Sequence, residues 1–380
     1  MNKILFISNI SNKITSFVIA SITAAHSLNM DFYQAANWQD ADLLQIATNE
    51  KAYDIKIKNV PISRNPLART NLSAYKELVE FIKQESIDYI HCNTPVGGIL
   101  GRLAGKKCKV KKVIYQAHGF HFYQGAPVKN WMLYYPVEKW LAHDTDALIT
   151  INKEDFELAK TKLKLHKGGR VYYVPGVGID TAQYSPNSIV KQEKRTELAI
   201  PPNAFVMISV GELNTNKNHR VIISAMKKQR NDKIHYVLCG TGKELSSLRQ
   251  QAEQAGLRNH VHFLGFRKDV RELYCMADCF VMPSLREGLS RSMMEAMASG
   301  LPCIASRIRG NTDLLEDGTG GYLCEPTDVQ SFAKAIEALC HDDALREAMG
   351  KSNLVTIQKF GSDTVSKEIR KIYETEFLGG

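Results

Sequence analysis

The chain has 380 residues, of which 44% are hydrophobic and 23% are charged, and its formal net charge is +9. This composition excludes a largely disordered chain, no stretch reaches the roughly 18 uninterrupted apolar residues that span a bilayer, and the length predicts two domains. The positive charge is concentrated in residues 1–180, which carry 23 Lys and Arg against 16 Asp and Glu, a balance that suits an anionic partner.

In the first half of the chain, short apolar runs alternate with helix-like stretches. The runs predict buried strands at residues 3–7, 87–92, 113–117 and 147–151. We expect a polar loop at residues 8–13, a helix from there to residue 28, and another helix at residues 96–104. This alternation predicts parallel βαβ units, in which helices cover both faces of a sheet.

The second half of the chain repeats this organisation. Strands are predicted at residues 205–210, 234–239, 261–264, 279–282 and 302–305, and helices at residues 243–255, 269–277 and 291–299. The glycines and prolines of residues 174–186 indicate the join between the two halves. The sequence therefore predicts an α/β protein with two doubly wound, Rossmann-like domains, residues 1–178 and 179–363.

Two features predict the cellular compartment. The N-terminus leads directly into an apolar strand and shows no signal-peptide cleavage pattern. The eight cysteines form no Cys-x-x-Cys pair and mostly lie inside apolar strings, as buried structural thiols do. We therefore expect a cytoplasmic protein, with peripheral attachment to the inner face of the membrane as a second option.

The strongest chemical signal begins after the strand at residues 279–282. Its candidate ligand-binding residues are Glu287, Gly288, Leu289, Ser290, Arg291 and Glu295. The start of the following helix offers unpaired backbone N–H groups and the positive end of the helix dipole, both of which favour a phosphate. Carboxylates accept hydrogen bonds from sugar hydroxyls. One short segment could thus hold a sugar, a diphosphate and a ribose.

Residues 287–302 read E-G-x6-E-A-M-A-x-G-x-P, which resembles the signature of family 4 of the retaining glycosyltransferases. The resemblance covers residues 205–340 closely and residues 1–180 more loosely, and points to the branch that builds bacterial capsules and exopolysaccharides. It implies the GT-B fold, in which two Rossmann-like domains face a central cleft. The first would bind the acceptor and the second the nucleotide-sugar donor, and a C-terminal helix at about residues 364–380 would pack back on the first.

The resemblance also implies roles for single residues. Glu287 would contact the donor sugar as a catalytic residue, and Glu295 would bind the ribose hydroxyls. Gly211 permits a tight turn after its strand, and Lys217 can present a compact positive charge to the diphosphate, although an ordinary exposed lysine is the alternative. Many relatives have an arginine where this chain has Glu212, so their two-cation clamp is altered here, and Arg286 or Arg291 could compensate.

Three further segments complete the predicted site. Gly240 lies in a Gly-x-Gly turn, which could equally be ligand-free, and Phe266 lies in the segment that packs around the base in relatives. His118 follows the strand at residues 113–117, where relatives place a catalytic histidine near the donor sugar. Gly119 and His121 follow it, although both histidines could simply be packed side chains. In the first loop, Asn9 could line the cleft without the glycines found in relatives.

The resemblance implies transfer of a sugar from UDP-hexose or UDP-N-acetylhexosamine to a lipid-linked glycan, with no cofactor and no metal ion. Asp-x-Asp strings at residues 40–42 and 144–146 are too short to indicate a metal site. The basic first half and residues 127–136, which mix Trp, Tyr and Lys, suit an anionic membrane surface or a helix packed on the core. The alternatives are a sugar-nucleotide epimerase, a non-catalytic nucleotide or glycan binder, and a nucleic-acid binder that rests on charge alone.

Overall fold

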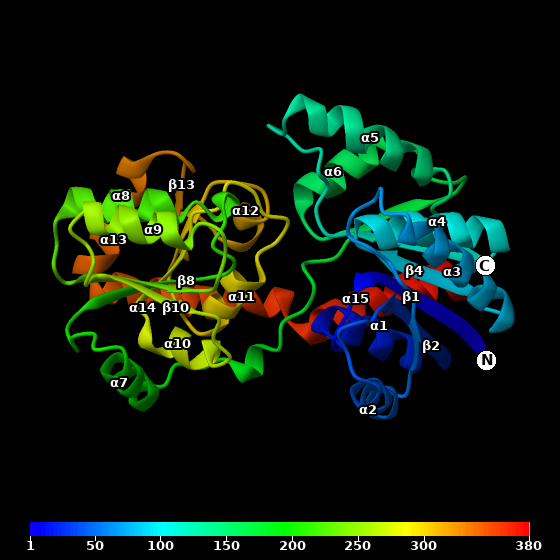
Figure 1. Ribbon diagram of the computed structural model, residues 1–380, viewed down its shortest axis with the longest axis horizontal. Coiled ribbons are helices and arrows are strands. Elements are labelled where there is room, and N and C mark those ends of the chain that lie inside the picture. The colour runs from blue at the N-terminus through cyan, green and yellow to red at the C-terminus, as the bar shows by residue number, and fades with distance from the viewer. Residues whose placement is uncertain (380) are drawn as a thin grey trace. The chain divides into compact units, whose positions relative to one another are not determined.

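The computed structural model describes residues 1–379, and within them the chain divides into two compact units. Unit 1 comprises Met1–Gly178 together with the segment from Ser362 onward, and unit 2 comprises Ile179–Gly361. Each unit is built on one parallel sheet with helices on both faces (Figure 1). The predicted fold class, two doubly wound α/β sheets, is confirmed.

Over the described residues, the sheet of unit 1 has seven parallel strands in the order β3-β2-β1-β4-β5-β6-β7. The strands are β1 (Asn2–Ile10), β2 (Met30–Asn37), β3 (Lys56–Asn59), β4 (Tyr89–Asn93), β5 (Lys112–Ala117), β6 (Ala147–Thr150) and β7 (Arg170–Tyr173). The helices are α1 (Ser16–Ser27), α2 (Leu43–Tyr53), α3 (Thr70–Gln84), α4 (Pro95–Cys108), α5 (Val128–Ala142), α6 (Lys153–Lys162) and α15 (Ser362–Tyr373), which a wider helical turn, η4 (Glu374–Leu378), continues.

The sheet of unit 2 has six parallel strands, all within the described range, in the order β10-β9-β8-β11-β12-β13. They are β8 (Phe205–Val210), β9 (Ile234–Cys239), β10 (Val261–Gly265), β11 (Cys279–Met282), β12 (Cys303–Ser306) and β13 (Gly321–Cys324). The helices are α7 (Ser188–Glu197), α8 (His219–Gln229), α9 (Leu245–Gln254), α10 (Val270–Met276), α11 (Arg291–Ala298), α12 (Asn311–Leu314), α13 (Val329–His341) and α14 (Asp343–Thr356), with short turns η1 (Thr181–Gln183), η2 (Thr215–Lys217) and η3 (Ile357–Phe360). Figure 1 shows α8, α9 and α13 on one side of this sheet and α7 and α10 on the other.

The sheet of unit 1 has two apolar cores, one on each face. Because side chains alternate along a strand, Leu5 and Ile7 of β1 pack under α3 and α4, whereas Ile4 and Phe6 pack under α1 and α15. Helix α15 lies beside α1 (Figure 1) and contributes Val365, Ile369, Ile372 and Tyr373 to the second core. The end of the described chain therefore completes one layer of the unit in which the chain begins.

Several predicted boundaries differ from those of the structure by a few residues. The polar loop expected at residues 8–13 is shorter, because β1 continues to Ile10, which pairs with Asn37 after a register shift. Strand β12 begins one residue later than predicted, since Pro302 has no N–H to contribute to a ladder. The C-terminal helix begins at Ser362 rather than 364, and residue 380 of the predicted range lies outside the described residues.

Adding a side chain to the glycine-lined face of α4 should destabilise the protein. A Cβ built on Gly101 lies 2.5 Å from Cβ and 3.0 Å from Sγ of Cys92 on the sheet below. Alanine favours a helix over glycine by about 1 kcal/mol, but overpacking a rigid core costs about 1–3 kcal/mol. We expect Gly101→Ala to lower the free energy of unfolding in urea, whereas Lys107→Ala on the exposed side of α4 leaves it within about 0.5 kcal/mol. A stabilised Gly101→Ala protein would contradict this close packing.

Candidate functional site

The candidate residues lie where the order of the strands reverses in each sheet. In a doubly wound sheet, neighbouring strands on either side of the reversal send their following loops to opposite faces, which leaves a crevice at the carboxyl ends of the strands. The reversal falls between β8 and β11 in unit 2 and between β1 and β4 in unit 1. The predicted residues form two groups, one in each unit.

In unit 2, the loops that follow β8 and β11 are bound to each other. The N–H of Leu285 donates to the carbonyl of Asn216 at 2.7 Å, and the Asn216 side-chain amide donates to the carbonyl of Arg286 at 3.0 Å. This junction places Nζ of Lys217 2.7 Å from Oε1 of Glu287, with both side chains mostly buried. The two residues predicted to handle phosphate and sugar thus form one ion pair at the switch point.

Helix α11 begins directly after this junction. The hydroxyl of Ser290 accepts from the N–H of Met293 at 3.3 Å and caps the helix. Gly310, whose φ is +79°, lies so close that a side chain there would collide with the carbonyl of Gly288. The backbone of Gly288 and Leu289 is therefore held in place from the neighbouring loop after β12.

Glu295 lies one turn into α11, and both of its carboxylate oxygens accept hydrogen bonds. Oε1 accepts from Nε of Arg291 at 2.9 Å, and Oε2 accepts from the hydroxyl of Tyr274 at 3.2 Å. Burial, followed by the charge of Glu295, raises the pKa of Tyr274 well above its usual value, so this hydroxyl remains a donor. Arg291, one of the two residues that could compensate for the missing arginine, is paired with Glu295.

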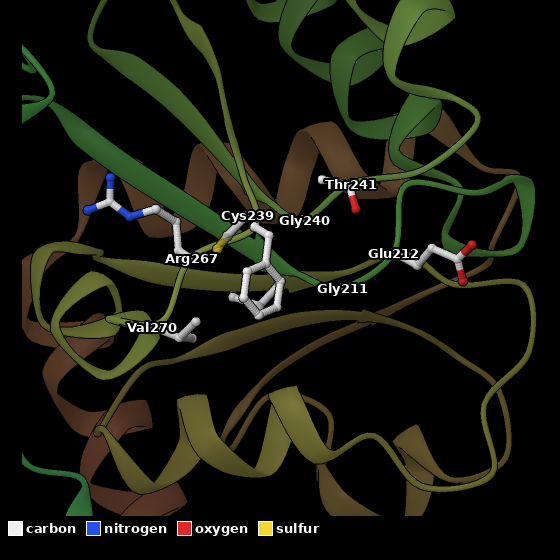
Figure 2. Close-up of a pocket in the computed structure, with 9 residues that line it drawn as sticks. Gly211, Glu212, Cys239, Gly240, Thr241, Arg267 and Val270 are labelled. Carbon is white, nitrogen blue, oxygen red and sulfur yellow. The ribbon is translucent and has the colours of Figure 1, made fainter. Parts of the chain in front are cut away.

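A pocket of about 340 Å³ lies at the ends of β8 and β9 (Figure 2). It brings together four predicted residues and five others, namely Gly211, Glu212, Gly240 and Phe266 with Val210, Cys239, Thr241, Arg267 and Val270. Gly240 approaches Gly211 so closely that a side chain at 240 would collide with the Gly211 carbonyl. Position 240 therefore requires glycine, which lets the two loops approach each other at the floor of the pocket.

The charged residues at the two ends of this pocket carry opposite charges. Figure 2 shows Glu212 and Arg267 on opposite sides of Gly211 and Gly240. The Glu212 side chain is exposed, and the Arg267 guanidinium is held by Asp269 at 2.6 Å and by a second carboxylate from α7. Sequence reasoning did not single out Thr241, Arg267 or Val270, although Thr241 and Arg267 each lie beside a predicted pocket residue in the chain.

Behind Lys217, a buried hydrogen-bonded cluster fixes the start of α8. Nδ1 of His219 lies 2.9 Å from the hydroxyl of Tyr236, which lies 2.7 Å from Oγ of Ser209. Burial, and then the charge of Lys217, lowers the pKa of His219 to about 3. A neutral imidazole therefore ties the residue after the Lys217 loop to β8 and β9.

In unit 1, His118 follows β5 at the carboxyl edge of the sheet. Burial, and then the proximity of His91, lowers the pKa of His118 to about 3, so its imidazole is neutral at physiological pH. The N–H of Phe120 donates to Oδ2 of Asp155 at 3.0 Å, and Asp155 also accepts from the Asn152 side chain at 2.7 Å. Sequence reasoning missed Asp155, which holds the loop that begins with His118 and Gly119.

The other two candidates in unit 1 have local partners. The His121 ring packs against Tyr134 with ring centroids 4.6 Å apart. Oδ1 of Asn9 accepts from the N–H of Gly97 at 2.6 Å and from the hydroxyl of Thr94 at 2.7 Å, so it fixes the start of α4. The structure places Asn9 and His118 at the ends of β1 and β5, with β4 between those strands.

The Asp-x-Asp strings have structural partners. Asp144 pairs with Lys106 at 2.9 Å, Asp146 accepts from the N–H of Val113 at 2.8 Å, and Asp42 caps α2. In the part of the chain that the structure describes, no group of three or more His, Cys, Asp or Glu side chains is arranged to hold a metal ion. Across residues 1–379, no helix combines the length and the apolar character needed to cross a bilayer.

Two family models match the sequence. The one described as Glycosyl transferases group 1 matches residues 190–354, and the one described as Glycosyl transferase 4-like matches residues 3–152. The chain is 36% identical to a Bacillus subtilis (strain 168) protein named glycosyltransferase EpsD, over 98% of this chain and 96% of that one. It is 29% identical to an Escherichia coli protein named UDP-Gal:alpha-D-GlcNAc-diphosphoundecaprenol alpha-1,3-galactosyltransferase, over 75% of this chain and 74% of that one.

Solved structures share the fold over the whole chain. Anabaena HepE in complex with UDP-glucose gives a TM-score of 0.80 at 22% identity and covers 99% of this chain and 100% of that chain. Sucrose-phosphate synthase from Thermosynechococcus elongatus gives a TM-score of 0.81 at 17% identity, with full coverage of both chains. At these identities the likeness concerns the fold, and it confirms the GT-B class predicted from the sequence.

Acid should destabilise the protein through its buried neutral histidines. His219 binds a proton only near pH 3 when folded, whereas an unfolded histidine titrates near pH 6.5. Between these values the unfolded chain binds more protons, so the stability falls as the pH falls, by about 2 kcal/mol for this residue between pH 7 and pH 5. Urea unfolding at the two pH values should show a loss smaller by about that amount in His219→Asn, which keeps a polar side chain without titrating. An unchanged pH dependence in the variant would contradict a neutral His219.

Proposed function

The chain belongs to the glycosyl transferases group 1 family, and on this premise we propose that it is a retaining enzyme that transfers a sugar from UDP-hexose or UDP-N-acetylhexosamine to a lipid-linked glycan in capsule or exopolysaccharide synthesis. The observation that carries the proposal is the Lys217–Glu287 pair at the switch point of unit 2. It joins the end of a pocket bounded by glycines to the start of α11, so that base, diphosphate and sugar would have adjacent sites.

The nucleoside would occupy the pocket beside Gly211 and Gly240. Phe266 exposes 76% of its surface there and offers an aromatic face to a base. Glu295 would then bind the ribose hydroxyls, since one carboxylate can accept several hydrogen bonds. Unit 2 is thus proposed as the donor-binding domain.

The diphosphate would lie between Lys217 and the start of α11. A lysine ammonium has three donors. Glu287 accepts from one and the sulfur of Met282, at 3.9 Å, from another, so one remains for a phosphate oxygen. Glu287 retains a second oxygen for a hydroxyl of the donor sugar. Backbone N–H groups of α11 would add to the positive potential, which matters more here because the exposed Glu212 replaces the second cation found in many relatives.

The chemistry would consist mainly of positioning and charge stabilisation. The bond between the anomeric carbon and the phosphate oxygen breaks, a bond to the acceptor oxygen forms on the same face of the sugar, and the acceptor proton passes to the leaving phosphate. Lys217 and the start of α11 would stabilise the charge on that phosphate. His118, neutral at physiological pH, would keep the role that the sequence predicts for it, a hydrogen bond to a sugar hydroxyl.

The names of relatives support the choice of substrates. The Escherichia coli relative is named for a UDP-linked sugar and a diphosphoundecaprenol acceptor, and the structure of HepE contains UDP-glucose. The proposal for this chain adopts the class, a UDP-sugar and a lipid-linked glycan, without the particular sugar. Unit 1 is proposed as the acceptor-binding domain.

Helix α5 in unit 1 offers a surface for that lipid. Its outer face consists of eight exposed side chains, Val128, Lys129, Met132, Leu133, Pro136, Val137, Lys139 and Trp140. Glu138 points inward and pairs with the buried Arg102 at 2.8 Å, so the outer face carries cations and apolar groups but no acid in the described helix. We propose that this face rests on an anionic membrane, since such a mixture favours the lipid–water interface.

The first test is nucleotide binding by thermal shift with UDP, GDP and ADP. UDP at 100 times its dissociation constant should stabilise the protein by about 2.7 kcal/mol. Glu295→Ala should weaken this shift, whereas Glu253→Ala, which removes an exposed carboxylate from α9, should leave it unchanged.

The binding test together with an assay of turnover separates the alternative functions. Absence of a shift with every nucleotide would contradict the proposed site. Donor conversion without any acceptor would favour an epimerase, and binding without turnover, even when lipid-linked sugars are added, would favour a non-catalytic binder.

Membrane docking has its own test. The protein should sediment with phosphatidylglycerol vesicles and bind them more weakly at high salt. The double variant Leu133→Ser, Trp140→Ser should lose most of this binding, while Val355→Ser, at an equally exposed apolar position in unit 2, should retain it. Equal binding of all three proteins would remove α5 from the docking surface.

A further inference from the structure

A file of polar side chains crosses the apolar layer between the sheet of unit 1 and its helices α1 and α15. Its members are Ser21 on α1, Tyr373 on α15, His91 on β4, Gln116 on β5 and His118 just beyond β5. The register of the sheet pairs His91 with Ile114 and Asn93 with Gln116. Because side chains alternate along a strand, His91 and Gln116 lie on the same face, and His118 follows Gln116 at the same period of two.

The centre of the file is a contact between His91 and the C-terminal helix. Nδ1 of His91 lies 2.7 Å from the hydroxyl of Tyr373, and both side chains are fully buried. Burial lowers the pKa of His91 to about 3, an effect that Gln116 opposes, so the ring is neutral. In a neutral imidazole one nitrogen donates and the other accepts, and the phenol thus fixes the orientation of the ring.

The surroundings of the His91–Tyr373 pair are apolar, so either group would be costly to bury without its hydrogen-bond partner. The Phe6 ring meets the His91 ring edge-on at 4.9 Å, and Ile114, Ile369 and Ile372 belong to the same apolar core. A buried polar group that loses its partner costs about 1–3 kcal/mol, whereas an apolar pair of the same shape would fill the layer without that liability. The polar pair therefore needs an explanation beyond packing.

His91 shares a face of the sheet with Gln116, which lies two residues before the predicted catalytic residue His118. The proximity of His91 is the second cause, after burial, of the lowered pKa of His118. On this geometry, and resting on the proposed function, we propose that Tyr373 and His91 are positioning residues for His118. The hydroxyl of Tyr373 holds the His91 ring against β5, and the His91 ring in turn sets the position of the strand end from which His118 projects.

A second tyrosine, which lies on the same strand as His91, provides a matched control. Tyr89 lies two residues before His91 on β4, and its hydroxyl donates to the carbonyl of Phe377 at 2.8 Å while its ring stacks on that of Phe377 at 4.2 Å. Both tyrosine hydroxyls thus anchor the same C-terminal segment to the same strand. Only the hydroxyl of Tyr373 reaches a histidine of the file.

The experiment compares Tyr373→Phe with Tyr89→Phe, each of which removes one buried hydroxyl and keeps the ring. The imidazole nitrogen resonances of His118, followed by NMR in the full-length protein, should shift in Tyr373→Phe and stay in place in Tyr89→Phe. In the transfer assay, Tyr373→Phe should lower kcat by about tenfold or more, as small misplacements of catalytic groups do, with little change in the KM for the donor.

Two further variants exclude a merely structural effect. His91→Phe should reproduce the loss seen in Tyr373→Phe, and the double variant should be no worse than either, because the two residues act through one contact. Equal losses in Tyr89→Phe and Tyr373→Phe, or an unmoved His118 resonance in Tyr373→Phe, would overturn the proposal. The NMR outcome holds whether or not the protein transfers a sugar, so a failure of the proposed function, no transfer by the unaltered protein, is distinguished from a failure of this inference.

Discussion

A parallel sheet can reverse its direction of winding only where two neighbouring strands send their following loops to opposite faces. That constraint decides where loops meet in both units of this protein. In unit 2 it brings the loop after β8 beside the loop after β11, and the backbone bonds around Asn216 then fix their distance. The Lys217–Glu287 pair, the start of α11 and the glycine-floored pocket are arranged by this single feature of topology.

Several charged side chains at the candidate site of unit 2 are paired with an opposite charge. Lys217 lies against Glu287 and Arg291 against Glu295, while Arg267 is enclosed by carboxylates. Pairing with an opposite charge offsets part of the desolvation cost of a charge. It also holds each side chain in one position before any substrate binds. An enzyme that works by placing charge needs this kind of preorganisation, because reorienting side chains during the reaction would cost free energy.

The sequence predicted most strongly what depends on neighbours in the chain. Strands β8, β9 and β11 were predicted at the bounds they have, because each is a buried apolar run ended by a turn. Strand β3 was not predicted, since no residue in it is fully buried and it shows no apolar run. The signature over residues 287–302 indicated the donor segment, but the partners that hold it, Asn216 and Gly310, carry no local pattern. The contact between His91 and Tyr373 joins residues 282 positions apart and was beyond any reading of local sequence.

The return of the C-terminal segment to unit 1 has a consequence for synthesis. Unit 2 is continuous from Ile179 to Gly361 and can complete its sheet while the ribosome is still elongating the chain. Most of unit 1 is synthesised first. It lacks α15, which covers one face of its sheet, until the residues from Ser362 onward leave the ribosome. The domain that begins first is therefore finished last, and in the meantime its uncovered apolar face is a surface that chaperones would bind and that would otherwise aggregate.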